Sequence, residues 1–154
     1  MRIITQNVQY ASVTIDGKVY SEIKEGYLLL VSFTNGDDRL ICDKMIKKLI
    51  NLRVFPDSNG KTNLSIKDIN GSFLSISQFT LYADCKEGNR PSFINECLKH
   101  DEASALYDYF NVALKNESGL VVKTGVFGAD MKVALLNDGP FTIILDSKEL
   151  FKWK

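Results

Sequence analysis

The segment Ser77–Tyr82 (Ser-Gln-Phe-Thr-Leu-Tyr) carries hydroxyl and amide side chains at the end of an apolar run. Side chains alternate along a strand, so Leu74, Ile76, Gln78 and Thr80 are predicted to share one face. An apolar face that becomes polar at its end can deliver those polar groups to the rim of a pocket. The alternative is that Thr80 is simply a good strand former and that Gln78 is exposed to solvent.

A second unusual segment, Asn137–Thr142 (Asn-Asp-Gly-Pro-Phe-Thr), lies between two strand-like runs, 131–136 and 141–145. An Asp-Gly pair between such runs normally forms a two-residue hairpin turn with positive φ at both positions. Here Pro140 would occupy the last position of that turn, where its missing N–H cannot close the turn. Proline also pushes Gly139 towards an extended conformation. Local signals that conflict often mark a functional site; the alternative is an ordinary loop.

The residue types that serve the commonest hydrolytic and metal-dependent mechanisms are scarce. His100 is the single histidine, so a Ser-His-Asp or Cys-His arrangement would have to use it. It lies beside Asp101 at a predicted helix start, where we expect a solvated side chain. The three cysteines, Cys42, Cys85 and Cys97, show no Cys-x-x-Cys spacing. This pattern is typical of reduced cytosolic thiols, and we expect neither a metal site nor a cofactor.

Of two basic segments in the chain, the first is a plausible contact for phosphate. Arg90-Pro91-Ser92-Phe93 is basic and conformationally restricted, although a surface turn is the alternative. Lys44, Lys47 and Lys48 form a basic stripe on a predicted helix, a pattern that is usual for a solvated face.

Length and composition suit one domain, residues 1–154, with a sizeable core: 45% of the residues are hydrophobic and 25% are charged. No apolar run approaches the ~20 residues of a membrane span. The N-terminus lacks a signal-peptide h-region, so we expect a cytoplasmic protein with no membrane partner. The 19 basic and 19 acidic residues give a net charge of zero. Without a basic excess we expect no DNA partner, and any RNA contact must be local or limited to a few nucleotides.

The first half of the chain predicts strands followed by a helix. Residues 3–15, with a possible break near Tyr10-Ala11, and residues 18–23 read as strands joined by an Asp16-Gly17 turn. The almost continuously apolar run 27–33 predicts a central strand buried on both faces. The helix is predicted to begin after a cap at Asp37 or Asp38, and its apolar residues recur at helical spacing. These residues are Ile41, Met45, Leu49 and Leu52.

The second half predicts one more helix and several strands. The helix is expected to begin at Asp101 as its N-cap and to end near Ser118, with Gly119 as a stop signal. The expected strands are 72–82, 120–127, 131–136 and 141–145. Strands grouped at both ends around two helices predict an α+β fold, with a curved sheet or partial barrel and the helices outside.

Taken together, these segments resemble the D-aminoacyl-tRNA deacylase family over almost the whole chain. The matching motifs occur in the right order and spacing. They are Gln6-x-Val8, Ala11-Ser12-Val13, Ser77-Gln78-Phe79-Thr80-Leu81, Gly88-x-Arg90-Pro91-x-Phe93, Ala105-Leu106-Tyr107-Asp108-Tyr109-Phe110, Thr124-Gly125-x-Phe127-Gly128-Ala129-Asp130-Met131 and Asn137-Asp138-Gly139-Pro140-x-Thr142.

The resemblance implies an enzyme that hydrolyses the ester joining a D-amino acid to the 3′ end of tRNA, and that also removes mischarged glycine. The implied fold is a single-domain, barrel-like β-sheet flanked by two main helices, which works as a homodimer. Its active site, at the subunit interface, receives the partner's Gly139–Pro140 loop, in which this family has a cis peptide bond. Carbonyl groups around the substrate α-carbon would then clash with an L side chain and admit hydrogen or a D side chain.

The resemblance also implies roles for single residues. Ser77, Gln78, Phe79 and Thr80 form the catalytic segment, and the N–H groups of Phe79 and Thr80 are candidates for the oxyanion site. Thr80 is a possible nucleophile, but no neighbouring His or Lys is evident to activate it. The alternative, which we favour, is that the 2′-hydroxyl of the tRNA assists the attacking water.

Substrate binding falls, by the same resemblance, to residues from three other segments. They are Gly139, Pro140, Phe127, Met131, Ala103, Asn137 and Thr142. Ala103 would lie near the terminal adenosine, whereas Phe127 and Met131 would line the pocket. Core packing is the alternative for the last two.

The chain departs from the family at one position. The family usually has Gln-Arg-Val near the N-terminus, where this chain has Gln6-Asn7-Val8. Asparagine is shorter and uncharged, so it offers fewer and weaker donors to the Gly139–Pro140 carbonyls. Our hypothesis is that the loop is braced differently and rejects L substrates less strictly. The alternative functions are an editing deacylase with glycine-dominated or relaxed chiral specificity, and a non-catalytic module that binds tRNA ends.

Overall fold

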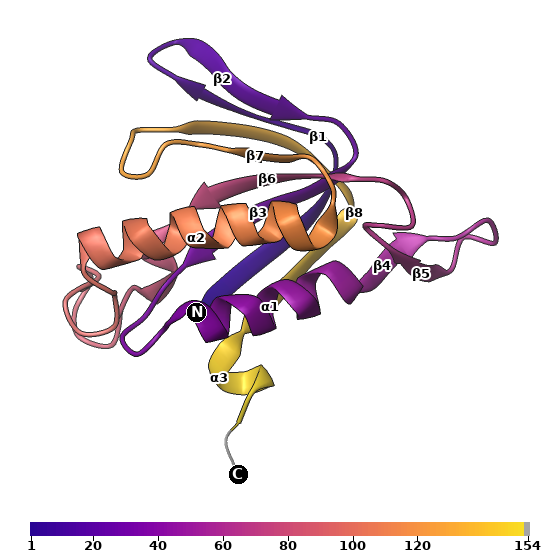
Figure 1. The fold of residues 1–154 in the computed structure, drawn as a ribbon. Helices are drawn as coiled ribbons and strands as arrows, with labels where there is room; N and C mark the ends of the chain where they lie inside the picture. Colours follow the sequence, from indigo (N-terminus) through magenta and orange to yellow (C-terminus); the bar gives the residue numbers. More distant parts are fainter. Residues whose placement is uncertain (153–154) are drawn as a thin grey trace.

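The computed structural model describes residues 1–152, which form a curved sheet with helices on its outer side (Figure 1). In chain order the elements are β1 (Arg2–Ile15), β2 (Lys18–Ile23), β3 (Gly26–Ser32), α1 (Arg39–Asn51), β4 (Arg53–Pro56), β5 (Thr62–Ser65), β6 (Ser72–Ser77), the 3-10 helix η1 (Phe79–Tyr82), α2 (His100–Ser118), β7 (Val122–Thr124), β8 (Lys132–Asp146) and α3 (Ser147–Leu150). Within these described residues, no helix has the length and apolar character that a membrane span requires.

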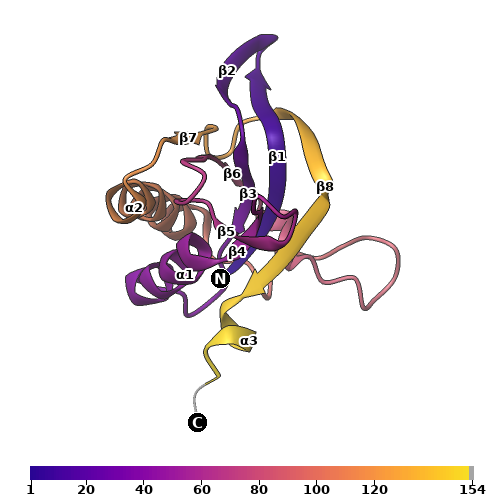
Figure 2. The same cartoon turned by 90° about the vertical axis from the view of Figure 1, so that its right-hand side faces the viewer.

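The long strand β1 organises the six-stranded sheet. The strand order is β2-β1-β3-β6-β7, and β8 pairs with β1 as well. Pairs that involve β1 are antiparallel, whereas β3–β6 and β6–β7 are parallel. The Ser21 hydroxyl of β2 donates to the Thr124 carbonyl of β7 at 2.7 Å. The two ends of the sheet therefore meet, and the sheet curls into a nearly closed barrel (Figure 2).

Strand β3 is buried on both faces, as its apolar run predicts. Tyr27, Leu29 and Val31 belong to the core that α1 and α2 cover, whereas Leu28 belongs to a smaller core on the other face. The predicted fold class is confirmed, because the helices pack outside a barrel-like sheet.

The helix boundaries follow local signals closely. Asp38 caps α1 by accepting a hydrogen bond from the Ile41 N–H at 2.9 Å, which confirms one of the two predicted caps. Helix α2 begins at His100, so the predicted N-cap at Asp101 is wrong. Asp101 lies in the first turn instead, where a carboxylate interacts favourably with the helix dipole. Gly119 ends the helix in the left-handed conformation, with φ 67°, as predicted.

The runs 131–136 and 141–145, which resemble two paired strands in the sequence, do not pair with each other. Both segments belong to one strand, β8, and both pair with β1 rather than with each other. The physical reason is length, because β1 has 14 residues and its edge accepts both segments in succession.

The pairing register locates the interruption in β8. Gln6 pairs with Thr142, but Val8 pairs with Asn137. The residues between Asn137 and Thr142 therefore bulge out of the sheet opposite the single residue Asn7. We call residues 138–141 the Gly-Pro excursion.

Two further strands are shorter than predicted. Strand β6 ends at Ser77. The Gln78 N–H still donates to the Val31 carbonyl of β3 at 2.8 Å, but β3 itself ends at the next residue, Ser32, and offers β6 no further partner. The chain then winds into η1, so Gln78 and Thr80 do not continue the apolar face of Leu74 and Ile76. The strand predicted over 120–127 is limited to β7.

Candidate active site

A cavity of about 620 Å³ opens where β6, η1, the first turn of α2 and the segment after β7 meet. Six residues that the sequence predicts for the site contribute to its wall from separate parts of the chain. They are Ser77, Gln78, Phe79, Ala103, Phe127 and Met131. The fold therefore gathers these six side chains around one cavity.

Phe127 and Met131 are partly buried in this wall, so they combine packing with exposure to the cavity. The Phe127 ring lies 5.8 Å from the ring of Tyr107, whose hydroxyl donates to the Ser75 carbonyl at 2.7 Å. Met131 is held closely, because a Cβ added to Gly125 would stand 2.4 Å from its sulfur. Gly125 is therefore a point of close packing in the cavity wall.

Thr80 lies beside the cavity and does not line it. Its side chain is exposed, and its Oγ1 accepts a hydrogen bond from Gln78 Nε2 at 2.6 Å. Among the residues that the structure describes, no His or Lys hydrogen-bonds to Thr80 Oγ1. No group of three or more His, Cys, Asp or Glu in the described chain is placed to hold a metal ion.

The first two N–H groups of η1 belong to Phe79 and Thr80. The next N–H group, that of Leu81, donates to the Gln78 carbonyl at 3.3 Å. The N–H group of Ala83 donates to the Thr80 carbonyl at 3.1 Å. Within residues 1–152 neither Phe79 nor Thr80 has a hydrogen-bond acceptor for its N–H. Such orphan donors at a helix start are available to a ligand.

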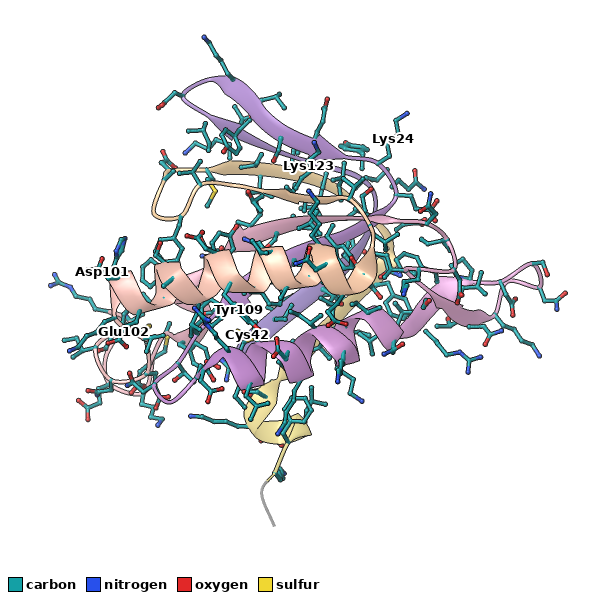
Figure 3. All side chains as sticks on the ribbon, viewed as in Figure 1. Lys24, Cys42, Asp101, Glu102, Tyr109 and Lys123 are labelled. Atoms are coloured by element: carbon teal, nitrogen blue, oxygen red, sulfur yellow. The ribbon has the colours of Figure 1, made fainter. Side chains whose placement is uncertain are left out.

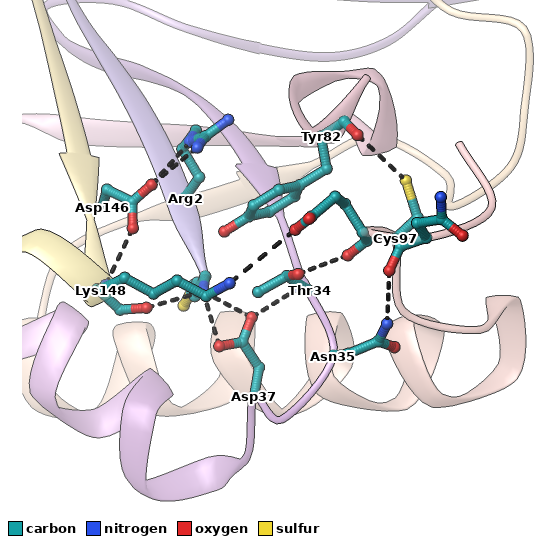
Figure 4. A network of polar contacts seen from close by, with 12 residues as sticks. Arg2, Thr34, Asn35, Asp37, Tyr82, Cys97, Asp146 and Lys148 are labelled. Carbon is teal, nitrogen blue, oxygen red and sulfur yellow. Dashed lines mark hydrogen bonds and ion pairs between the residues drawn. The ribbon is translucent and has the colours of Figure 1, made fainter. Parts of the chain in front are cut away.

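A polar network holds η1 against the sheet (Figure 4). Arg2 Nη1 donates to the Leu81 carbonyl at 2.6 Å, and Arg2 Nε donates to Asp146 Oδ2 at 3.0 Å. The guanidinium also lies 4.5 Å from the centroid of the Tyr82 ring. The end of the β1–β8 pair at which Arg2 faces Asp146 thus helps to position the segment that carries Phe79 and Thr80.

The segment before α2 is tied to the same region (Figure 4). Thr34 donates through its hydroxyl to the carbonyl of Glu96, and the Cys97 thiol lies 3.6 Å from the carbonyl of Phe79. Burial, followed by the nearby Glu96 carboxylate, raises the pKa of the Cys97 thiol. Cys97 is therefore a protonated, cavity-lining group at neutral pH.

The Phe79 side chain is 58% exposed and packs edge-on against Phe93, with ring centroids 5.1 Å apart. Phe93 follows a pinched loop in which Asp84 and Ser92 exchange two backbone hydrogen bonds, both of 2.8 Å. Figure 2 shows this loop, between η1 and α2, projecting from the sheet on the side away from α1 and α2. Arg90 is exposed on it, in agreement with a surface turn.

Sequence reasoning missed His100 as a cavity residue. Its ring packs edge-on against Phe127 at 5.1 Å, and Nδ1 lies 3.2 Å from Asp101 Oδ1. The side chain is exposed, as expected, but it forms part of the cavity rim. The signal that could have found it is its spacing from Ala103, because residues three apart lie on one face of a helix.

The Gly-Pro excursion contributes no residue to this cavity. Its Gly139–Pro140 peptide bond is cis, and both residues are exposed. Asn137 joins its two sides: Oδ1 accepts from the Phe141 N–H at 2.7 Å, and Nδ2 donates to Thr142 Oγ1 at 2.9 Å. The four predicted residues of this segment are thus together, but apart from the other six.

Asn7 does not brace the excursion with its side chain. It is buried, and its Nδ2 donates to the Val54 carbonyl at 2.9 Å. Its Oδ1 has no hydrogen-bond partner among the described residues. Within the protomer, the side-chain hydrogen bonds across the excursion come from Asn137.

Comparison with known proteins agrees with this architecture. The sequence profile of the family described as D-Tyr-tRNA(Tyr) deacylase matches residues 4–146. The D-aminoacyl-tRNA deacylase of Lactobacillus acidophilus is 53% identical over 146 residues, which cover 95% of this chain and 99% of the relative. The protein of the same name from Lactobacillus gasseri is 51% identical over the same shares.

Two solved structures share the fold. The first, described as c-Myc DNA Unwinding Element Binding Protein, has a TM-score of 0.88 and 36% identity, and the alignment covers 95% of this chain and 98% of that one. The second, a probable eukaryotic D-amino acid tRNA deacylase, has a TM-score of 0.82 and covers 94% and 97%. At 15% identity the second likeness shows the fold alone. With the family profile and the close relatives, these observations show that the chain belongs to the D-aminoacyl-tRNA deacylase family, a family of ester hydrolases that act on aminoacyl-tRNA.

Proposed function

We propose that this enzyme removes D-amino acids, and also glycine, from the 3′ end of tRNA in the cytoplasm, and that main-chain groups supply both the oxyanion site and the chiral filter. The observation that carries the proposal is the pair of unpartnered N–H groups of Phe79 and Thr80 at the start of η1, beside the cavity, among residues 1–152. Two adjacent donors suit the oxyanion that develops when water attacks an ester, and removing one such donor typically costs about 10²–10³ in rate.

The attacking water is assisted by the 2′-hydroxyl of the terminal ribose. Thr80 Oγ1 is already engaged by Gln78 and has no described His or Lys partner, so it lacks the base that an active nucleophile needs. In this mechanism Gln78 and Thr80 orient the segment Ser77–Tyr82, and Ser77 and Phe79 shape the wall of the cavity. The ester breaks to a free amino acid and a tRNA that regains its 3′-hydroxyl.

The chiral filter acts between the two subunits of a homodimer. Within one protomer the Gly-Pro excursion is exposed and lies outside the cavity wall, so it is available to a second subunit. Placed in the partner's cavity, the carbonyls of Gly139 and Pro140 would block an L side chain and leave room for hydrogen or a D side chain. Ala103 would lie near the terminal adenosine, and Phe127 and Met131 would line the pocket.

The test compares hydrolysis of D-Tyr-tRNA, L-Tyr-tRNA and Gly-tRNA by the purified protein, with its oligomeric state measured at the assay concentration. We expect hydrolysis of the D-aminoacyl and glycyl esters, little hydrolysis of the L ester, and a dimer. Equal rates on D- and L-Tyr-tRNA would contradict the chiral filter. Tight tRNA binding without hydrolysis of any of the three would contradict the enzymatic proposal itself.

A further inference from the structure

A second groove, of about 490 Å³, lies along α1, away from the catalytic cavity. Four cationic side chains line it: Lys44, Lys47, Lys48 and Arg53. The Phe151 ring, which follows α3, closes it on one side, 5.7 Å from Lys44 Nζ. We call this the α1 groove.

The positive charge of the α1 groove is local, because the whole chain has a net charge of zero. Among the described residues, no carboxylate belongs to its lining. Lys47 and Lys48 are exposed, and neither forms an ion pair with any of residues 1–152. These two lysines therefore present their charge to solvent rather than to acidic neighbours.

Several acidic side chains lie near this groove but do not line it. Hydrogen bonds from Ser65, and then the nearby Arg53 guanidinium, lower the pKa of the Asp68 carboxyl. Asp43 and Glu117 line a neighbouring groove that shares Lys47, and Asp43 accepts a hydrogen bond from the Tyr109 hydroxyl at 2.7 Å. Glu149 pairs with Lys152 at 3.0 Å. None of these carboxylates belongs to the lining of the α1 groove.

Two of the cations lie about one helical turn apart on α1. Lys44 and Lys48 are separated by four residues, which is about 6 Å along the axis at ~1.5 Å per residue. Arg53 adds a cation to the same groove from β4, where its Nε donates to the Asn63 carbonyl at 2.8 Å. Several cations beside an aromatic ring are a combination that nucleic-acid-binding surfaces use.

We propose that the α1 groove binds the phosphate backbone of the substrate tRNA, away from the aminoacylated end. The inference rests on the proposed function, which supplies tRNA as the polyanion. Contacts to phosphate carry no sequence information and mainly add affinity and register. The groove would thus hold tRNAs that carry different amino acids equally well.

The experiment pairs two double variants of the full-length protein. Lys47→Ala with Lys48→Ala removes two exposed cations from the groove. Lys24→Ala with Lys123→Ala is the matched control, because these lysines are also exposed and Figure 3 shows them on the side of the molecule opposite α1. Thermal melts of all proteins check that folding is unchanged.

The first measurement is the binding of uncharged tRNA, followed by fluorescence anisotropy across a salt series. We expect the groove variant to bind about tenfold more weakly near 0.1 M salt and to lose about two units of the slope of log K against log salt. The control variant should differ little from the parent protein. Equal effects of the two variants, or no effect of either, would overturn the proposal.

The second measurement is kinetic. The KM of the groove variant for D-aminoacyl-tRNA should rise by about the same factor as its tRNA binding weakens, and its kcat should stay unchanged. Its kinetics on a D-aminoacyl-adenosine, which lacks the phosphate backbone, should match those of the parent. Weaker hydrolysis of this small substrate would show that the lysines act on the catalytic cavity, contrary to the proposal. Because uncharged tRNA binding is measured without hydrolysis, failure of the deacylase function is distinguished from failure of the groove.

Discussion

Asn137 and Thr142 lie at the two sides of the Gly-Pro excursion, and the Asn137 side-chain amide donates to the Thr142 hydroxyl at 2.9 Å. The same Asn137 side chain accepts a hydrogen bond from the Phe141 N–H at 2.7 Å. Because β8 pairs with β1 on both sides of the excursion, these two bonds close a loop whose ends are already anchored. The side chain of Asn137 thus braces the excursion within the protomer, whereas that of the buried Asn7 does not.

We expect Asn137→Ala to loosen the excursion and to lower kcat/KM for D-aminoacyl-tRNA by about tenfold or more. It should also reduce discrimination against the L substrate. The loss of two hydrogen bonds costs about 1–3 kcal/mol of stability. Steady-state kinetics on D- and L-Tyr-tRNA, with urea unfolding, check both effects.

Two further variants separate the contributions of this brace. Asp138 lies next to Asn137, and its side chain forms no hydrogen bond among the described residues. Asp138→Ala should therefore behave like the parent protein. Thr142→Val removes only the Nδ2 bond and should have a smaller effect than Asn137→Ala. Unchanged chiral discrimination in Asn137→Ala would show that the brace does not set the position of the carbonyls.

Gly125 and Met131 are in close contact across the cavity wall. A Cβ at Gly125 would stand 2.4 Å from the Met131 sulfur and 3.3 Å from Ile76 Cδ1. Gly125→Ala should therefore push the Met131 side chain into the cavity and raise KM severalfold. Overpacking of this kind typically costs about 1–3 kcal/mol of stability.

A double-mutant cycle identifies the cause of the Gly125 effect. Met131→Ala alone removes one wall of the cavity, but in the Gly125→Ala background it should also relieve the clash. The two changes should therefore be less than additive in the free energy of unfolding. Strict additivity would indicate that the methyl group added by Gly125→Ala is accommodated without displacing Met131.

Thr80→Val should retain deacylation within about tenfold of the parent protein, because the hydroxyl orients Gln78 and is not the proposed nucleophile. A substrate whose terminal ribose lacks the 2′-hydroxyl should instead lose about 10²-fold or more in kcat, a typical range for loss of acid–base assistance. Rapid-quench measurements of single-turnover rates test both expectations. Accumulation of an acyl-enzyme, or inactivity of folded, tRNA-binding Thr80→Val, would favour covalent catalysis by Thr80.

The three thiols should react in an order set by exposure and pKa. Cys85 is exposed, the Cys97 pKa is raised by burial and then by Glu96, and burial raises the Cys42 pKa to about 12. Only the thiolate is nucleophilic, so alkylation of Cys97 should be slow near pH 8 and should accelerate as the pH rises through its elevated pKa.

Mass spectrometry of peptides alkylated with iodoacetamide measures this order. We expect Cys85 to be modified first, Cys97 later and Cys42 only after unfolding. Because Cys97 lines the cavity, tRNA bound by its 3′ end should slow the labelling of Cys97 and leave that of Cys85 unchanged. Equal protection of Cys97 by an RNA without a free 3′ end would contradict its place in the cavity.

Local sequence was sufficient wherever structure depends on a few neighbouring residues. The Asp16-Gly17 turn, with φ of 51° and 76°, and the Gly119 stop were both predicted because each needs only a suitable residue at a left-handed position. The continuous apolar run from Tyr27 likewise predicted a strand buried on both faces. The family resemblance pointed to six residues that the structure gathers around one cavity.

Long-range pairing decided the rest. Phe79–Tyr82 has the composition of a strand, yet it turns into η1 because β3 ends and offers it no further partner. The segments on either side of the Gly-Pro excursion have the pattern of a hairpin, yet the 14-residue β1 pairs with both of them. His100 and Cys97 reach the cavity only because α2 and its preceding segment pack against η1 and Phe127. The energy of such contacts comes from residues far apart in the chain, so no local pattern could specify them.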